Sequence, residues 1–209
     1  MPDLALETTA QNDGFQVICG VDEAGRGPWA GPVVAGAVIL DLSALSDHLR
    51  LGLDDSKKLK PAAREGLFDI LRLEARVGIG RAEVEEIDSL NILQASLLAM
   101  RRAVDDLSVP TPDFALVDGN RDPEMFCTVR TVVKGDGLSL SIAAASIVAK
   151  VTRDHMMSDL DQQFPGYGWA HNAGYGTAEH KAALARLGVT PVHRKSFAPI
   201  RKMLSPEAS

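Results

Sequence analysis

Four acidic side chains stand where apolar, strand-like runs of the sequence end. Asp22 and Glu23 follow "FQVICGV", Asp118 follows "FALV", and Asp136 follows "TVVK". If these runs are neighbouring strands, the carboxylates converge at the mouth of a sheet and repel one another unless cations neutralise them. Hard oxygen ligands suit Mg²⁺ or Mn²⁺, so the pattern predicts a divalent-metal site. The alternative is that Asp118 and Asp136 only cap loops ahead of a glycine.

A glycine-rich turn, Gly25-Arg26-Gly27, comes directly after the first acidic pair. It lacks the spacing of a dinucleotide or Walker loop and leads into a strand, which argues against both kinds of site. Its glycines can still present backbone N–H groups to a sugar hydroxyl or a phosphate. Adjacent strand residues normally point to opposite faces, but such a turn can bring Asp22 and Glu23 toward one centre. A tight turn without a binding role is the alternative.

The remaining pattern indicates an α/β fold with a mixed sheet, because the first two strand-like runs look hairpin-connected. Residues 1–14 lack periodicity and are expected to form a mobile tail. The helix expected at 139–164 is rich in small residues, which would let it lie close against a sheet. Strands are expected within 15–21, 31–40, 76–84, 114–119 and 127–137, and further helices within 60–75, 89–107 and 177–188.

Composition is typical of a globular protein with one main domain: 209 residues, 45% hydrophobic and 24% charged. The sequence has no apolar run long enough to span a membrane and no secretory signal pattern, so the cytoplasm is the expected location. Cys19 and Cys127 are the only cysteines, which argues against a disulfide framework or a thiolate zinc site. Both are expected to be buried as small apolar residues.

The net charge of −6 is distributed unevenly along the chain. Residues 1–120 carry 11 basic and 20 acidic side chains, net −9, whereas residues 121–209 carry 11 basic and 8 acidic ones, net +3. Local basic clusters decide phosphate binding more than the total does. Four residues from two such clusters are therefore expected to form a nucleic-acid surface: Lys57, Lys58, Arg194 and Lys195.

Several longer motifs carry a family resemblance. In order and spacing, "GVDEAGRGPWAGPVVAGAVIL", "DDSKKL", "VDGN", "KGDGLSLSIAAASIVAKVTRDHMM", "GYGT" and "VHRKSF" closely resemble the motifs of bacterial ribonuclease HII, the type 2 ribonucleases H. The resemblance implies a ribonuclease H-like fold over residues 15–205, including a small C-terminal helical extension. It also implies an endonuclease that cleaves RNA in RNA–DNA hybrids and cuts at single ribonucleotides embedded in duplex DNA. The implied products carry 3′-hydroxyl and 5′-phosphate ends, and the implied role is ribonucleotide removal during DNA replication and repair.

The family's site residues are carried over by position in these motifs. Its four catalytic, metal-binding carboxylates, which hold two Mn²⁺ or Mg²⁺ ions, fall on Asp22, Glu23, Asp118 and Asp136. Its substrate-binding residues fall on Gly25, Arg26, Gly27, Ser56, Lys57, Lys58 and Tyr175. Tyr175 matches the tyrosine that packs beside the scissile junction. Ala173 stands where the family often has lysine, so one phosphate contact is expected to be missing.

A different class of function stays open at this point: a non-catalytic module that binds RNA–DNA hybrid. The presence of all four carboxylates argues against it, because such a module gains nothing from negative charge beside phosphates. Trp29 and Trp169 are interpreted as packing residues and not as a stacking series for bases. His171, His180 and His193 are interpreted as structural histidines, with assistance to proton transfer or phosphate binding as the alternative. The chain is expected to act as a monomer without membrane contact.

Overall fold

The computed structural model describes residues 1–107 and 109–205 and has a central five-stranded sheet. The strand order is β3-β2-β1-β4-β5. β1 pairs antiparallel with β2, and β2 with β3, while β1–β4 and β4–β5 are parallel, so the predicted mixed sheet is confirmed. The strands are β1 (Ile18–Ala24), β2 (Val33–Ile39), β3 (Arg76–Ala82), β4 (Phe114–Asp118) and β5 (Thr128–Val132).

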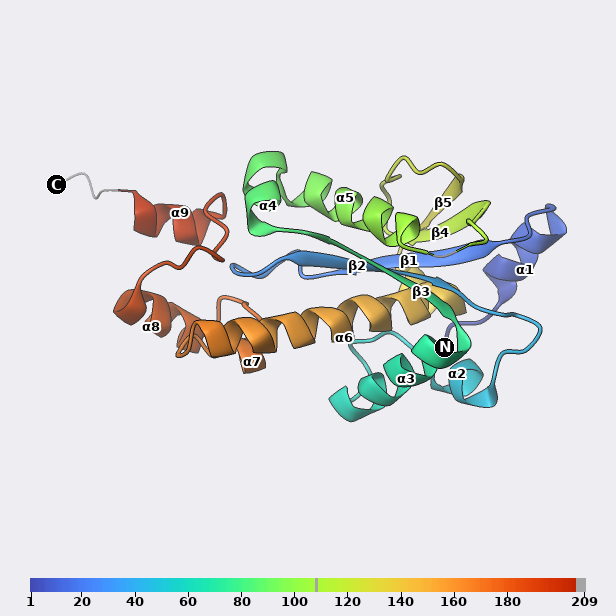
Figure 1. Cartoon of the computed structure of the whole chain (residues 1–209), viewed down its shortest axis with the longest axis horizontal. Coiled ribbons are helices and arrows are strands. Elements are labelled where there is room, and N and C mark those ends of the chain that lie inside the picture. The colour runs from blue at the N-terminus through green and yellow to red at the C-terminus, as the bar shows by residue number, and fades with distance from the viewer. Residues whose placement is uncertain (108, 206–209) are drawn as a thin grey trace.

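Helices cover both faces of this sheet (Figure 1). α5 (Ile92–Asp105) lies on one face with the short α4 (Val84–Leu90), and α6 (Leu140–Gln163) runs along the other. α2 (Asp47–Gly52) and α3 (Pro61–Glu74) lie outside α6, so this side has two helical layers. α7 (Trp169–Asn172), α8 (Ala178–Leu187) and α9 (Ala198–Leu204) form the expected C-terminal extension at the end of the molecule opposite α1 (Ala5–Asn12).

Glycines in the strands set the distance between the sheet and its helices. A Cβ at Gly20 would lie 2.0 Å from the Ser141 carbonyl carbon, and one at Gly36 would lie 2.6 Å from the Ala145 carbonyl oxygen, both in α6. A Cβ at Gly80 would lie 2.1 Å from a carbonyl oxygen of α5. The expected close packing of the small-residue helix on the sheet is therefore confirmed, and glycines on the sheet side make it possible as well.

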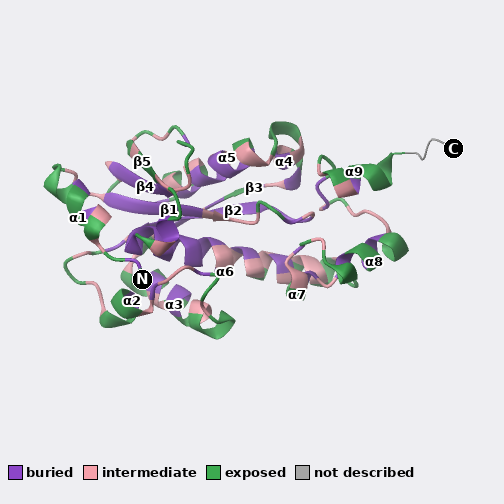
Figure 2. Cartoon of the chain, turned by 180° about the vertical axis from the view of Figure 1, so that it is seen from behind, coloured by how far each residue is buried: buried purple, intermediate pink, exposed green. Residues whose placement is uncertain are grey.

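Burial follows these layers: the sheet and the inner faces of α5 and α6 are buried, while α8 and α9 are largely exposed (Figure 2). One apolar cluster fills the space between the sheet and α5, and another lies between the sheet, α6 and α3. A separate cluster around Trp169 and Leu184 ties the C-terminal extension to the end of α6. Cys19 is buried and Cys127 partly buried, both against the α5 cluster. No helix of the described residues meets the length and apolarity needed to cross a bilayer.

The structure differs from the expected tail at residues 1–14. α1 forms there, and the fully buried Glu7 carboxylate accepts hydrogen bonds from the Ser139 hydroxyl at 2.5 Å and the Ser141 N–H at 2.9 Å. Asp3 also forms a parallel bridge with Ser139. These long-range contacts cannot be read from local periodicity. They fasten the segment that follows Asp136 and leads into α6.

The helix expected over 89–107 is also divided in the structure. Asn91 has φ 73°, a left-handed conformation that ends α4. Its side-chain oxygen then accepts hydrogen bonds from the N–H groups of Leu93 and Gln94 and caps α5. Asparagine is among the non-glycine residues that adopt a positive φ most often, and it is a favourable N-cap.

Candidate active site

The parallel pairing of β1 with β4 brings the predicted carboxylates to one edge of the sheet. Val21 is the register partner of Val117, so Asp22 and Asp118 leave neighbouring strands side by side. Asp136 follows in the short 3₁₀ turn η1 (Gly135–Gly137), and the Gly135 N–H donates to Asp118 Oδ1 at 2.6 Å. β4, β5 and the turn before α6 thus converge where β1 ends.

An open pocket of about 360 Å³ adjoins this edge. Its lining includes Asp22, Glu23 and Asp118, the Gly25-Arg26-Gly27 turn, and Ser56, Lys57, Ser146, Lys150, Arg153 and Tyr175. A second hollow of about 200 Å³ on the α5 side shares Glu23, Arg26 and Asp118 and adds Asn120 and Arg121. Asp22, Glu23 and Asp118 all line the first hollow, and Glu23 and Asp118 also line the second, so the acidic pair shares one pocket.

The carboxylates raise one another's pKa at this edge. Burial raises the pKa of Asp22 well above its ordinary range, and the negative charges of Glu23 and Asp118 raise it further. Burial also raises the pKa of Glu23, although the Arg26 guanidinium opposes this, and Arg26 Nη1 lies 3.1 Å from Glu23 Oε1. The pKa of Asp118 is raised by burial and by Asp136, against the hydrogen bond from Gly135. Positive charge bound beside this cluster would therefore favour its ionised form.

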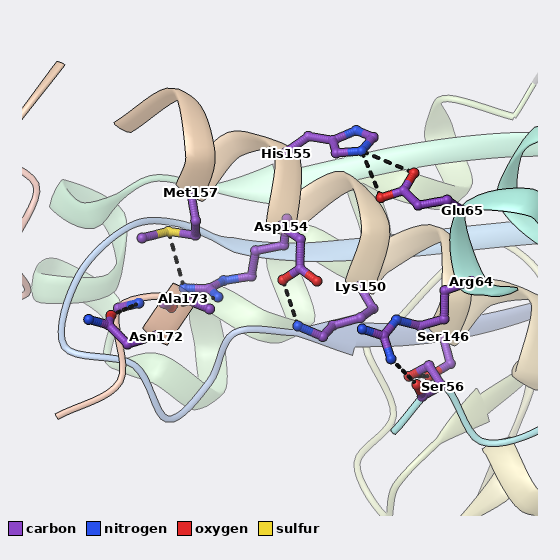
Figure 3. A network of polar contacts seen from close by, with 12 residues as sticks. Ser56, Arg64, Glu65, Ser146, Lys150, Asp154, His155, Met157, Asn172 and Ala173 are labelled. Carbon is purple, nitrogen blue, oxygen red and sulfur yellow. Dashed lines mark hydrogen bonds and ion pairs between the residues drawn. The ribbon is translucent and has the colours of Figure 1, made fainter. Parts of the chain in front are cut away.

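Three lysines stand near the carboxylates, and each has a different environment. Lys57 Nζ lies 3.8 Å from Asp136 Oδ2; its burial acts to lower its pKa, but the surrounding carboxylates raise it above the ordinary value. Lys150, on α6, is held at 2.5 Å by Asp154 one turn further along (Figure 3). Lys58 is exposed and pairs with Asp54 at 3.2 Å. Only Lys57 and Lys150 line the pocket.

Ser56 differs from the expectation that its side chain approaches nucleic acid. It is 3% exposed, and its hydroxyl lies 2.9 Å from the Ser146 hydroxyl of α6 (Figure 3). Its carbonyl accepts from Arg64 Nη1 at 2.8 Å. Ser56 therefore fastens the loop that carries Lys57 to α6, beside Asp22.

The glycine turn and Tyr175, about 150 residues apart in sequence, meet in the structure. A Cβ at Gly27 would lie 3.2 Å from Tyr175 Cε1, so the ring packs over a position where only hydrogen fits easily. Tyr175 remains 50% exposed and lines the pocket. Gly25 has φ 98°, a left-handed conformation that favours glycine.

Arg194 is not on the surface, which corrects its assignment to a nucleic-acid face together with Lys195. Its side chain is fully buried and donates to main-chain carbonyls of the β1–β2 connection. Arg153 of α6 is 2% exposed and binds the same connection. Neither role could be predicted from the sequence, because the carbonyls that these arginines bind lie 20 to 169 positions away in the chain.

His180, His193 and the tryptophans fill structural roles, as predicted, whereas His171 is exposed, which corrects its assignment as a structural histidine. His180 Nδ1 lies 3.0 Å from the Tyr175 carbonyl, and His180 Nε2 accepts from Trp169 Nε1 at 3.2 Å and lies 3.0 Å from His193 Nε2. Burial, reinforced by His180, lowers the pKa of His193 to about 4, so this ring is neutral at pH 7. Trp29 packs on Gly176. The network fixes the backbone beside Tyr175.

Comparison with known proteins identifies the family. The family model for ribonuclease HII matches residues 19–200. A ribonuclease HII from Ruegeria pomeroyi is 58% identical over 207 residues, covering 99% of this chain and 86% of the relative. The chain belongs to the ribonuclease HII family. It is accordingly a ribonuclease H endonuclease, and the resemblance seen in the sequence motifs is confirmed.

Solved structures agree with this assignment. The ribonuclease H2 of Pyrococcus horikoshii OT3 superposes with a TM-score of 0.75 at 29% identity, covering 90% of this chain and 97% of that one. Bst-RNase HIII, solved in complex with Mn²⁺, has a TM-score of 0.75 at 20% identity and covers 93% of this chain and 71% of that one. The second likeness shows a shared fold. The ribonuclease H-like architecture predicted from the sequence is confirmed.

The raised pKa of Asp22 predicts that Asp22→Asn stabilises the protein in EDTA at pH 8. The unfolded chain releases this proton near pH 4 and the folded chain only at higher pH, so ionisation costs stability from about pH 4 upward, and the full cost applies above the folded pKa. We expect the melting temperature Tm to rise by at least about 3 °C at pH 8, or about 1 kcal/mol at this length. The gain should shrink at pH 4.

The control for this experiment is Asp69→Asn, at an exposed carboxylate of α3. Its effect should stay within about 0.5 kcal/mol, the usual range at the surface. Calorimetric melting of both variants and the wild type provides the comparison. A lower Tm for Asp22→Asn at pH 8 would contradict the assigned repulsion.

Proposed function

We propose that this chain hydrolyses the RNA strand of RNA–DNA hybrids and cuts at single ribonucleotides embedded in duplex DNA, using two divalent ions. The observation that carries the proposal is the meeting of two features at one pocket. Three of the four carboxylates line it, and so do the glycine turn and Tyr175, which could read a sugar. The role we propose is ribonucleotide removal during DNA replication and repair.

The donor chemistry of the site fits Mg²⁺ or Mn²⁺. All four candidate ligands are carboxylates, three of them with raised pKa values, and the two nearby ion pairs, Arg26–Glu23 and Lys57–Asp136, leave the cluster net negative. Among the described residues, no three histidine, cysteine, aspartate or glutamate side chains have a geometry that could hold a metal ion without rearrangement. Side-chain rotation on loading is therefore part of the proposal.

Asp22, Glu23, Asp118 and Asp136 would hold the ions. Divalent ions at such a site supply an activated water and stabilise the charge on the leaving oxygen. The water oxygen bonds to phosphorus while the bond from phosphorus to the 3′-oxygen breaks, which leaves 3′-hydroxyl and 5′-phosphate ends. The buried Asp22 is fixed by its own strand, since its Oδ1 accepts from the Glu23 N–H at 2.7 Å.

The glycine turn and Tyr175 would recognise the sugars around the cut. The 2′-hydroxyl distinguishes RNA from DNA, and backbone groups in a glycine turn can both donate to it and accept from it. The Tyr175 ring, half exposed beside Gly27, offers an apolar face to a neighbouring deoxyribose. The two together would select a junction between a ribonucleotide and DNA.

Lys57, Lys58 and Lys195 remain candidates for phosphate contacts along the duplex, since all three are exposed. Ala173, in place of the lysine frequent in the family, has no charge to offer a phosphate; its carbonyl accepts from Arg153. We also propose that the chain acts as a monomer. A substrate of this kind is consistent with a cytoplasmic enzyme.

Asp118→Asn tests the metal assignment. Asparagine keeps a side-chain oxygen for the Gly135 N–H but removes the negative charge, so cleavage in Mg²⁺ or Mn²⁺ should fall at least about 100-fold while Tm is maintained. Cleavage of a duplex with one embedded ribonucleotide and of one with a long RNA tract is the measurement. Asp69→Asn should cleave like the wild type. Near-wild-type activity of Asp118→Asn in saturating metal would refute the assignment.

Tyr175 provides a separate test of junction reading. Tyr175→Phe keeps the ring and should retain most activity, whereas Tyr175→Ala should lower kcat/KM on the single-ribonucleotide duplex by about 5- to 150-fold, the value of one stacking contact. Its loss within a long RNA tract should be smaller. Equal losses on both substrates would show that Tyr175 supports cleavage generally and does not read the junction.

A further inference from the structure

Two buried arginines stand behind the β1–β2 connection without a carboxylate partner. Arg194 is 0% and Arg153 2% exposed, and within the described residues neither has a carboxylate oxygen within 4 Å. Burial lowers the pKa of Arg194 to about 9 and that of Arg153 to about 10. Burying two guanidinium groups in this way is costly, and an apolar pair would avoid the cost. Their geometry indicates what they do.

All of the guanidinium hydrogen bonds except one from Arg153 to the Met157 sulfur go to main-chain carbonyls, and Arg194 also lies over the Phe197 ring. Arg194 donates to Gly25 at 2.6 Å, Gly31 at 2.9 Å, Arg26 at 3.1 Å and Pro32 at 3.1 Å. Arg153 donates to Pro32 at 3.0 Å, Ala173 at 3.0 Å and Ala30 at 3.2 Å. Figure 3 labels two of the residues that Arg153 binds, Met157 of α6 and Ala173. The two side chains thus bind the β1–β2 connection through its main-chain carbonyls, from the side that faces the protein interior.

These contacts fix the direction of the exposed N–H groups. In a planar trans peptide the C=O and the following N–H point in opposite directions. Since Arg194 draws the carbonyls of Gly25 and Arg26 inward, the N–H groups of Arg26 and Gly27 point away from it. Both residues are exposed and line the pocket, and neither N–H has a hydrogen-bond partner within the described part of the chain.

Arg153 supports the same turn from α6. A Cβ at Gly25 would lie 2.0 Å from Arg153 Nε, so the guanidinium packs directly against this glycine. Its bond to the Ala173 carbonyl reaches the segment just before Tyr175. One side chain therefore links the glycine turn to the segment that precedes Tyr175.

We propose that Arg194 is the positioning residue for ribose recognition: it orients the N–H groups of Arg26 and Gly27 toward the 2′-hydroxyl, and Arg153 secures the turn relative to Tyr175. This inference rests on the proposed function, in which the turn reads the sugar. Neither arginine touches the substrate. A lysine at either position keeps the charge but loses the planar fork that binds several carbonyls at once.

The experiment measures sugar discrimination by fluorescence anisotropy. Asp118→Asn protein, which should bind without cutting, is titrated in Mg²⁺ with a duplex carrying one ribonucleotide and with the same duplex entirely in DNA. The ratio of the two Kd values is compared after adding Arg194→Lys, Arg153→Lys or Leu184→Ala. Leu184 is 2% exposed in the same C-terminal cluster and touches no carbonyl of the turn, so Leu184→Ala is the control for general destabilisation.

We expect Asp118→Asn alone to favour the ribonucleotide duplex by about 10-fold, the value of one to two hydrogen bonds. Arg194→Lys should reduce the ratio to within about 2-fold of unity, whereas Leu184→Ala should lower Tm and keep the ratio. If Arg194→Lys does not fold, Arg153→Lys carries the test, with a smaller reduction.

An unchanged ratio in Arg194→Lys, or in Arg153→Lys where only that variant folds, would overturn the positioning role and leave the proposed function intact. An equal fall in Leu184→Ala would also overturn it, because loss of stability alone would then explain the result. No discrimination by Asp118→Asn itself would instead refute sugar reading by the turn, and with it this inference.

Discussion

Charge held inside the protein next to the β1–β2 connection is the constraint on which the rest of this structure depends. Asp22 and its neighbouring carboxylates lie on one side of the connection, and Arg153 and Arg194 lie behind it. Arg26 and Lys57 neutralise the carboxylates only in part, and the two arginines have no carboxylate oxygen within 4 Å among the described residues. Burial shifts the pKa values of Asp22 and of both arginines toward the uncharged form. Binding of cations from solution would stabilise the ionised carboxylates. The guanidinium groups donate hydrogen bonds to main-chain carbonyls instead.

The scaffold has to keep these groups in place against that cost. Parallel pairing of β1 with β4 puts Asp22 beside Asp118, and the bond from Gly135 to Asp118 sets the turn that carries Asp136. α6 can bring Ser146, Lys150 and Arg153 to the pocket because Gly20 and Gly36 allow it to lie against the sheet. Glu7 of α1 fastens the start of α6. Residues remote from the pocket thereby determine its geometry.

What could be predicted from the sequence follows from local pattern. The strands are marked by apolar, β-branched runs, and the mixed sheet by the hairpin-like connection of the first two. α6 is marked by its many small residues, and the carboxylates by their place after strand-like runs. The roles of Glu7, Ser56 and Arg194 could not be predicted, because each depends on partners 90 to 169 positions away in the chain. A basic motif such as "VHRKSF" is expected to lie on the surface, but in the fold His193 and Arg194 are buried.

The central claim is that the clustered carboxylates exist to bind divalent cations, and the Tm of the wild-type protein tests it most directly. Melting is measured at pH 8 in EDTA and in millimolar Mn²⁺ at equal ionic strength. Because ions that bind only the folded state stabilise it, about 2.7 kcal/mol at one hundred times Kd, Tm should rise by about 5–10 °C in Mn²⁺. An unchanged Tm at this concentration would contradict the account.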